Sequence, residues 1–120
     1  MDQNVKDHFE KAGFDVDGAI RRFGSNEALY EKYVFKFTDD KIYDNLVKAF
    51  TGGDMEAALR EAHTLKGVSG NLGLNPLFEP VNTLMGALRE GKSQSETSTL
   101  FAAVEAGYKT VINAINANKP

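Results

Sequence analysis

The side chains with the most evident chemistry lie in one short segment, residues 63–73. An imidazole that faces water is mostly neutral at pH 7 and offers a ring nitrogen as a nucleophile, and His63 supplies such a ring. On a helix, Lys66 lies one turn beyond His63, where its ammonium attracts anions. Gly67 and Gly70 leave the backbone bare beside these two side chains. The segment therefore suggests a nucleophile next to a positive charge, on a surface open to another molecule.

The two glycines contradict the helix that the neighbouring residues predict. Apolar residues recur at helical spacing from Ala58 through Leu65 to Leu72. Each glycine costs a helix interior about 1 kcal/mol relative to alanine, which suggests a use for both. The apolar stripe lies on the side of the helix opposite His63, so the histidine should face water. Gly70 lies nearly in line with His63, and this position favours the approach of a partner over close helix packing.

Other kinds of site lack the residues that they need. The chain has no cysteine, and its two histidines, His8 and His63, are 55 positions apart, so we expect no metal site and no cofactor. Ser69 lies between glycines but lacks the strand and the second flanking glycine of a hydrolase nucleophile. Arg60, one turn before His63, could extend the cationic surface, although solvation or pairing with Glu56 is the simpler explanation. Gly73 should simply end the helix.

Composition limits the partners that the protein can have. The 120 residues, 42% of them hydrophobic, suit one domain spanning residues 1–120. A net charge of −3, with 14 Lys and Arg residues that form no run, argues against nucleic-acid binding. No segment reads as a signal peptide or a membrane span. We therefore expect a cytoplasmic monomer without membrane insertion.

Helical periodicity covers nearly the whole chain, and the expected fold class is all-α. Residues 1–13 form an N-terminal extension with one short helix, and a second short helix is expected over about 16–23. The bundle helices are predicted at residues 27–37, 40–51, 55–73, 76–90 and 95–117. On the first of them, the inward stripe is predicted to be Leu29, Tyr33 and Phe37. Long amphipathic helices with short loops imply an antiparallel four-helix bundle, with the short N-terminal helices covering one end.

Local signals mark several helix ends. Asp54 should cap the helix that carries His63, and Ser93–Glu96 matches a capping box. Asn75 is expected to cap the next helix, with Pro76 in its first turn. Pro80 lacks an N–H about one turn further on, which predicts either a kink or a loose first turn.

The segment around His63 resembles the histidine-containing phosphotransfer (HPt) domain family. That family has a histidine followed three residues later by lysine, four later by glycine and ten later by another glycine. His63, Lys66, Gly67 and Gly73 match this pattern, and the resemblance extends from about Phe14 onward. It implies a relay in which a receiver domain's phospho-aspartate phosphorylates His63, which then phosphorylates a second receiver. The domain would have no nucleotide site of its own, and the receivers would bring their own divalent metal.

The resemblance also suggests roles for the neighbours of His63 and leaves other functions open. Lys66 would stabilise charge on the transferring group, and Gly67 would let the receiver dock closely. The chain could instead be a docking module that carries no phosphate, or the phosphoacceptor domain of a chemotaxis-type kinase. It could also be a piece of a hybrid histidine kinase. Well-known family members often use Gln on the following helix to hold the imidazole, but here the counted position is Met85, one turn from Asn82, and no residue is assigned that role.

Overall fold

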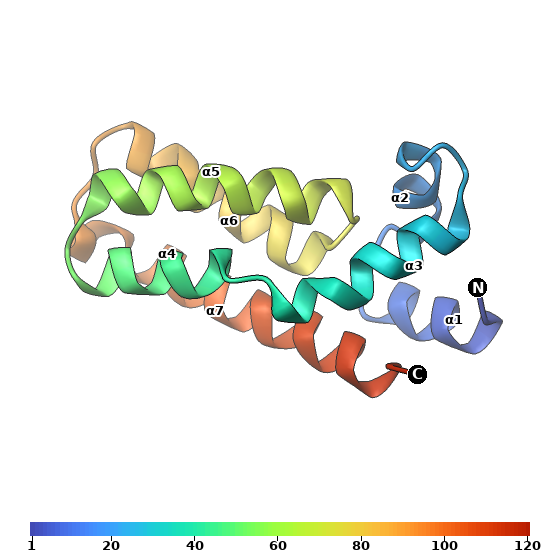
Figure 1. Cartoon of the computed structure of the whole chain (residues 1–120). Helices are drawn as coiled ribbons and strands as arrows, with labels where there is room; N and C mark the ends of the chain where they lie inside the picture. Colours follow the sequence, from blue (N-terminus) through green and yellow to red (C-terminus); the bar gives the residue numbers. More distant parts are fainter.

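The computed structural model describes all 120 residues, and every regular element in it is a helix (Figure 1). The first elements are α1 (Gln3–Lys11), α2 (Val16–Arg22), α3 (Glu27–Lys36) and the 3₁₀ turn η1 (Phe37–Asp39). They are followed by α4 (Ile42–Thr51), α5 (Met55–Asn71), α6 (Asn75–Arg89) and α7 (Gln94–Ala117). The predicted all-α class is confirmed, and no helix is both long enough and apolar enough to cross a lipid bilayer.

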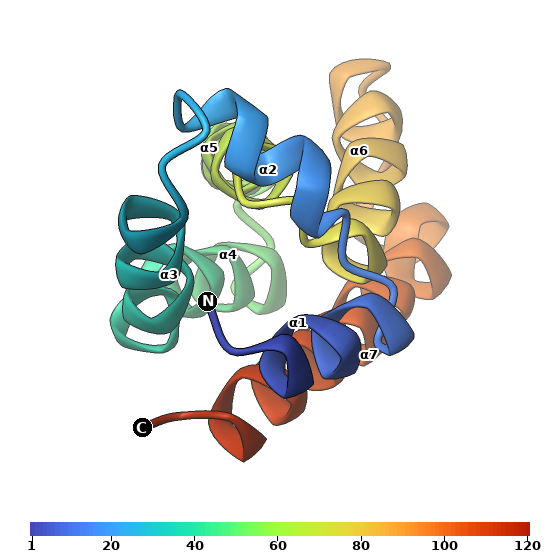
Figure 2. The same cartoon turned by 90° about the vertical axis from the view of Figure 1, so that its right-hand side faces the viewer.

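Helices α4 to α7 form the body of the molecule, and each packs against the next along the chain (Figure 1). Short loops join them, so that neighbouring helices run in opposite directions. The three N-terminal helices lie together at the end of the bundle where α7 terminates (Figure 2). The expected cover of one end by α1 and α2 is present, but α3, predicted as a bundle helix over residues 27–37, lies at that end with them.

The N-terminal segment is an integral part of the core. Phe9 of α1 has no exposed surface, and its ring centroid lies 4.9 Å from that of Phe14. Val16 and Ala19 of α2 are also buried. Residues 1–13, expected to be an extension, therefore contribute to the same hydrophobic core as the bundle.

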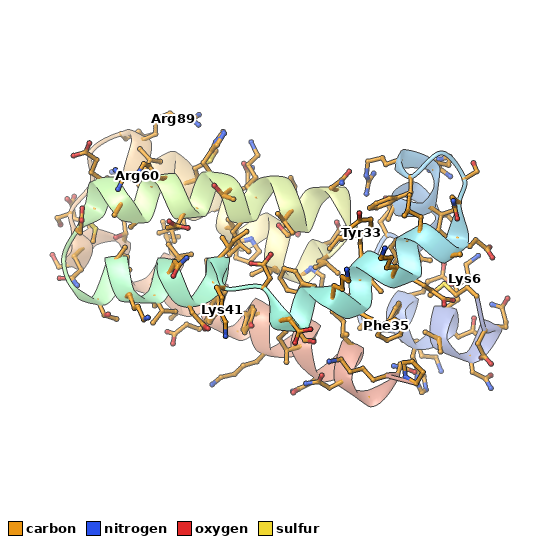
Figure 3. The ribbon with its side chains drawn as sticks, viewed as in Figure 1. Lys6, Tyr33, Phe35, Lys41, Arg60 and Arg89 are labelled. Atoms are coloured by element: carbon orange, nitrogen blue, oxygen red, sulfur yellow. The ribbon has the colours of Figure 1, made fainter.

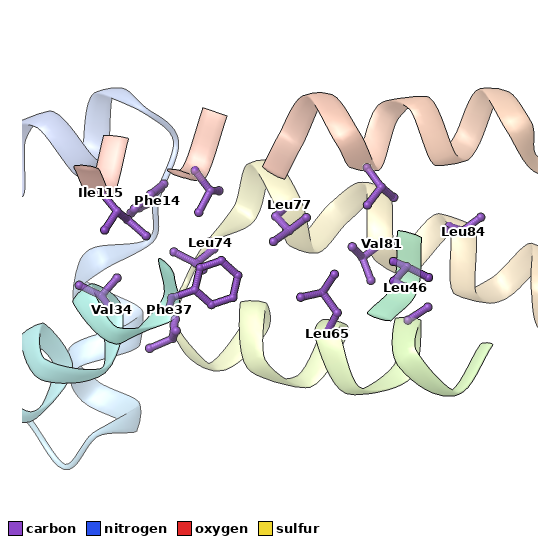
Figure 4. Close-up of a cluster of buried hydrophobic side chains, with 14 of the residues drawn as sticks. Phe14, Val34, Phe37, Leu46, Leu65, Leu74, Leu77, Val81, Leu84 and Ile115 are labelled. Atoms are coloured by element: carbon purple, nitrogen blue, oxygen red, sulfur yellow. The ribbon is translucent and has the colours of Figure 1, made fainter. Parts of the chain in front are cut away.

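The bundle core follows the predicted apolar stripes, except on α3. In α6 the four predicted inward residues are all buried, and some of them are drawn in Figure 4: Leu77, Val81, Leu84 and Leu88. On α3, however, Tyr30 and Val34 are fully buried, whereas Tyr33 is 44% exposed. The predicted stripe is therefore wrong by one residue. Phe37 was predicted correctly, but its helical stripe continues through Val34 and Tyr30 and not through Tyr33 and Leu29.

The end of α5 is fixed by a glycine and by contact with α2. Gly73 has φ 68°, and the N–H of Leu74 donates to the carbonyl of Ser69 at 2.9 Å, as in a Schellman motif. The predicted helix stop is confirmed, two residues earlier than expected, since α5 ends at Asn71. The Gly73 carbonyl accepts from the N–H of Asp15 at 2.8 Å. A β-carbon at Gly73 would collide with the Asp15 carbonyl, so this glycine also admits α2.

Two of the predicted caps are present and one is not. The Asp54 carboxylate accepts from the N–H of Ala57 at 3.0 Å, and both bonds of the Ser93 capping box form. Asn75 makes no capping hydrogen bond with its side chain. Helix α6 begins at Asn75 itself, and Leu74 occupies the cap position.

Pro80 does not loosen the start of α6, which is continuous from Asn75 to Arg89. Proline has no N–H to donate to the carbonyl four residues earlier, that of Pro76. This carbonyl lies against Gly107 of α7, where a β-carbon would collide with it. The expectation of a loose first turn is therefore wrong, and Gly107 lets the backbones of α6 and α7 approach closely at this point.

Candidate functional site

Helix α5 positions His63 on the face that points away from the core. Ala62 and Leu65, which flank it in the sequence, have no exposed surface, whereas His63 is exposed. The three residues occupy these sides because of the helical period of 3.6. His63 therefore faces water, as the spacing predicts.

The His63 ring has no protein partner that would fix its orientation. It takes part in no hydrogen bond and no ion pair. Met85, the residue at the position counted from the family pattern, is 2% exposed and belongs to the hydrophobic core. Asn82 is exposed and also makes no side-chain hydrogen bond. Neither residue holds the imidazole, so this ring is free to turn about its side-chain bonds.

His63 lies in a hollow of about 420 Å³ between α5 and the end of α6. We call it the arginine pocket and define it by its five lining residues: Leu59, Arg60, His63, Thr64 and Arg89. No acidic residue lines it. Figure 3 shows Arg60 and Arg89 near one end of α5 and Tyr33 near the other. The pocket thus places two guanidinium-bearing side chains beside the imidazole.

The two arginines have weak partners. Arg60 Nη1 lies 3.9 Å from Glu56 Oε1, and both side chains are well exposed, so this ion pair contributes little. Arg89 forms no ion pair, and its Nη2 donates to Met85 Sδ at 3.7 Å. The sequence did not predict that Arg89 lies beside His63, because the two residues are on different helices. The signal that was available is its position four residues after Met85, on the same face of α6.

Lys66 lies at the edge of a second and larger hollow, of about 790 Å³. We call it the aromatic groove. It runs between α5, α2 and α3 and is lined by the following residues: Arg22, Phe23, Tyr33, Asp40, Lys66, Gly67, Val68, Gly70, Asn71, Leu72 and Phe78. Arg22 Nε donates to the carbonyl of Asn71 at 3.2 Å, which places a cation at the C-terminus of α5. The predicted site residues therefore divide between two adjacent hollows, with His63 and Arg60 in one and Lys66 and Gly67 in the other.

The two glycines inside α5 have different surroundings. A β-carbon at Gly67 would meet no atom within 4 Å, and the residue is exposed. A β-carbon at Gly70 would lie 2.9 Å from Cε1 of Phe78 on α6. Gly70 therefore packs closely against Phe78, and because it also lines the aromatic groove, its assignment to the partner's approach stays a prediction. Gly67 is the bare position beside Lys66.

Two further features considered in the sequence were the second histidine and a metal site. His8 lies on α1, where its Nδ1 is 3.0 Å from Asn118 Oδ1 at the end of α7. No group of three or more His, Cys, Asp or Glu side chains is arranged to hold a metal ion. The chemistry that this surface can perform is therefore that of one imidazole with neighbouring cations.

Comparison with known proteins gives one match. The family model described as "Hpt domain" matches residues 34–114, which include His63, Lys66, Gly67, Arg60 and Arg89. No curated protein and no solved structure matches the chain. The matched range covers α4, α5 and α6 completely and most of α7, and it leaves out α1 and α2.

Proposed function

Because the chain belongs to the Hpt domain family and so takes part in histidine phosphotransfer of two-component signalling, we propose that His63 is its phosphoacceptor. The observation that carries this proposal is the position of His63. It is an exposed imidazole on the matched helix, next to Lys66 and the bare backbone of Gly67. The only other histidine, His8, lies outside the matched residues.

The proposed reaction is phosphoryl exchange with receiver domains, the partners of Hpt domains. The unprotonated ring nitrogen of His63 attacks the phosphorus of a receiver's aspartyl phosphate. The N–P bond forms as the P–O bond of the acyl phosphate breaks, and the aspartate carboxylate leaves. In the second transfer, a carboxylate of another receiver attacks the phosphorus and the ring nitrogen leaves. Each step exchanges one bond to phosphorus for another, so no nucleotide is consumed in this domain.

Lys66 and Gly67 support this reaction in different ways. The Lys66 ammonium, at the edge of the aromatic groove, would attract the equatorial oxygens of the transferring group. Gly67 presents no side chain, so that a receiver can approach α5 until its aspartyl phosphate reaches His63. The receiver would bring the divalent metal that completes the reaction centre. We further propose that the domain acts as a monomer, because one copy of the chain carries all of these residues, and that it acts in the cytoplasm together with its receivers.

The test uses a receiver domain carrying radioactive phosphate on its aspartate. Transfer should give the chain an acid-labile, base-stable label, which is the behaviour of phosphohistidine. His63→Gln should take up no label while keeping the helical circular dichroism spectrum. His8→Gln is the matched control and should be labelled as fully as the wild type.

The same experiment separates the alternatives. A wild-type chain that binds receivers but is never labelled would be a docking module. A chain that is labelled only by ATP and a kinase core would be the phosphoacceptor domain of a chemotaxis-type kinase. Undiminished label on His63→Gln would contradict the assignment of His63.

A further inference from the structure

The arginine pocket carries two positive charges that no carboxylate in its lining neutralises. Its two guanidinium groups lie beside His63 with no acidic residue in the lining. The nearest carboxylate to Arg60 is 3.9 Å away on an exposed Glu56, and Arg89 has none within 4.0 Å. Guanidinium groups bind phosphate oxygens in a planar, two-pronged geometry. An open pocket of this charge next to a nucleophile is therefore suited to an oxyanion attached to that nucleophile.

Met85 holds Arg89 at this pocket. The thioether is 2% exposed, and its Sδ accepts from Arg89 Nη2 at 3.7 Å. Sulfur is a weak acceptor, so the contact adds little energy. It does restrict the direction of a long and otherwise solvated side chain, from one turn earlier on α6. Met85 therefore cannot orient the imidazole itself, but it orients a guanidinium beside it.

We propose that Arg89, positioned by Met85 and assisted by Arg60, binds the phosphoryl group on His63 and slows its loss to water. This inference rests on the proposed function, because it concerns the phosphorylated form of His63. Hydrolysis requires water to attack phosphorus while the N–P bond breaks and the ring nitrogen takes a proton. The two guanidinium groups hydrogen-bond the phosphoryl oxygens and hold the group in the pocket, where the arginine side chains shield its phosphorus from attacking water, so the N–P bond stays intact for longer.

The experiment measures the lifetime of the phosphorylated chain in the absence of any receiver. Phosphoramidate, a small donor without a docking surface, loads His63, and the decay of phosphohistidine is then followed at pH 7. Arg89→Ala should lose its phosphoryl group about threefold to tenfold faster than the wild type, and Arg89→Lys should be intermediate. Met85→Leu keeps the volume of the side chain but removes the sulfur acceptor, and it should decay about twofold faster.

Two controls decide the outcome. Lys92→Ala removes an exposed cation outside the arginine pocket and should decay like the wild type. The difference between Arg89→Ala and the wild type should shrink in 1 M salt, which a merely structural effect would not do. Equal lifetimes for all variants would overturn this inference while leaving His63 as the phosphoacceptor. Failure of every donor to label the wild type would instead overturn the proposed function.

Discussion

At the scale of single residues, the two glycines of α5 separate a packing role from a surface role. Gly67→Ala should raise the free energy of unfolding by about 1 kcal/mol, because alanine favours the helix and its methyl group meets open space. Gly70→Ala should lose this gain or lower the stability, since its methyl group would press against the Phe78 ring. Urea unfolding followed by circular dichroism measures both. An equal gain at the two positions would contradict the packing role of Gly70.

A longer side chain at Gly67 tests whether this residue belongs to the surface on which the receiver docks. Gly67→Gln should leave the bundle folded and should strongly slow transfer from a phosphorylated receiver, because the side chain occupies the surface on which the receiver docks. Labelling of the same variant by phosphoramidate should stay close to wild type. Transfer from the receiver at the wild-type rate would show that Gly67 is not part of the docking surface.

The site residues that the sequence predicts are those whose relationship is local. His63, Lys66 and Gly67 lie within one turn of a single helix, so spacing alone indicates that they are neighbours. Arg89 and Phe78 reach this surface from α6, and their positions depend on how two helices pack. Neither the place of Arg89 beside His63 nor the contact of Gly70 with Phe78 could therefore be predicted from spacing along α5.

At the scale of the elements, the contact between α6 and α7 depends on one glycine. Gly107→Ala should lower the free energy of unfolding by roughly 3 kcal/mol, at the upper end for overpacking, because backbone atoms of Pro76 cannot rotate away from the added methyl group. Gly86→Ala is the matched control, since a β-carbon there meets no atom within 4 Å. It should be neutral or slightly stabilising. Urea unfolding of both variants checks this, and similar values for the two would refute the close contact.

Helix bounds and caps were predictable because they depend on a few adjacent residues. Asp54 and Ser93 cap their helices as expected, and Gly73 ends α5. The inward face of α3 was not predictable, because the stripe Leu29, Tyr33 and Phe37 and the stripe Tyr30, Val34 and Phe37 both have helical spacing. Only the packing against the other helices decides between them. The outcome at Pro80 was not predictable either, because a loose first turn and a continuous helix are both compatible with the local sequence.

At the scale of the whole molecule, the fold extends beyond the residues that match the family model. Deletion of residues 1–26 should destabilise the domain severely, because it removes Phe9 and Phe14 from the end of the core. The point variant Phe9→Ala tests the same contribution and should cost about 3–5 kcal/mol. Lys11→Ala, an exposed change in the same helix, should have little effect. A deleted chain that unfolds at the wild-type urea concentration would show that α1 and α2 are dispensable.

The fold class and the cover over one end of the bundle were predictable because helical periodicity runs through almost every segment. The depth to which α1 enters the core was not, since a short amphipathic helix has the same pattern whether it packs firmly or loosely.

The close contacts on the two sides of α6 have a consequence for how phosphorylation could change the molecule. Gly70 lets α5 pack closely against Phe78, and Gly107 lets α7 pack closely against Pro76, so α6 is in close contact with both neighbours. We therefore expect the phosphorylated and unphosphorylated forms of the domain to have the same backbone conformation. The signal would then exist as a single covalent bond, without any change of shape, and a partner could read it only by touching the phosphorus-bearing ring.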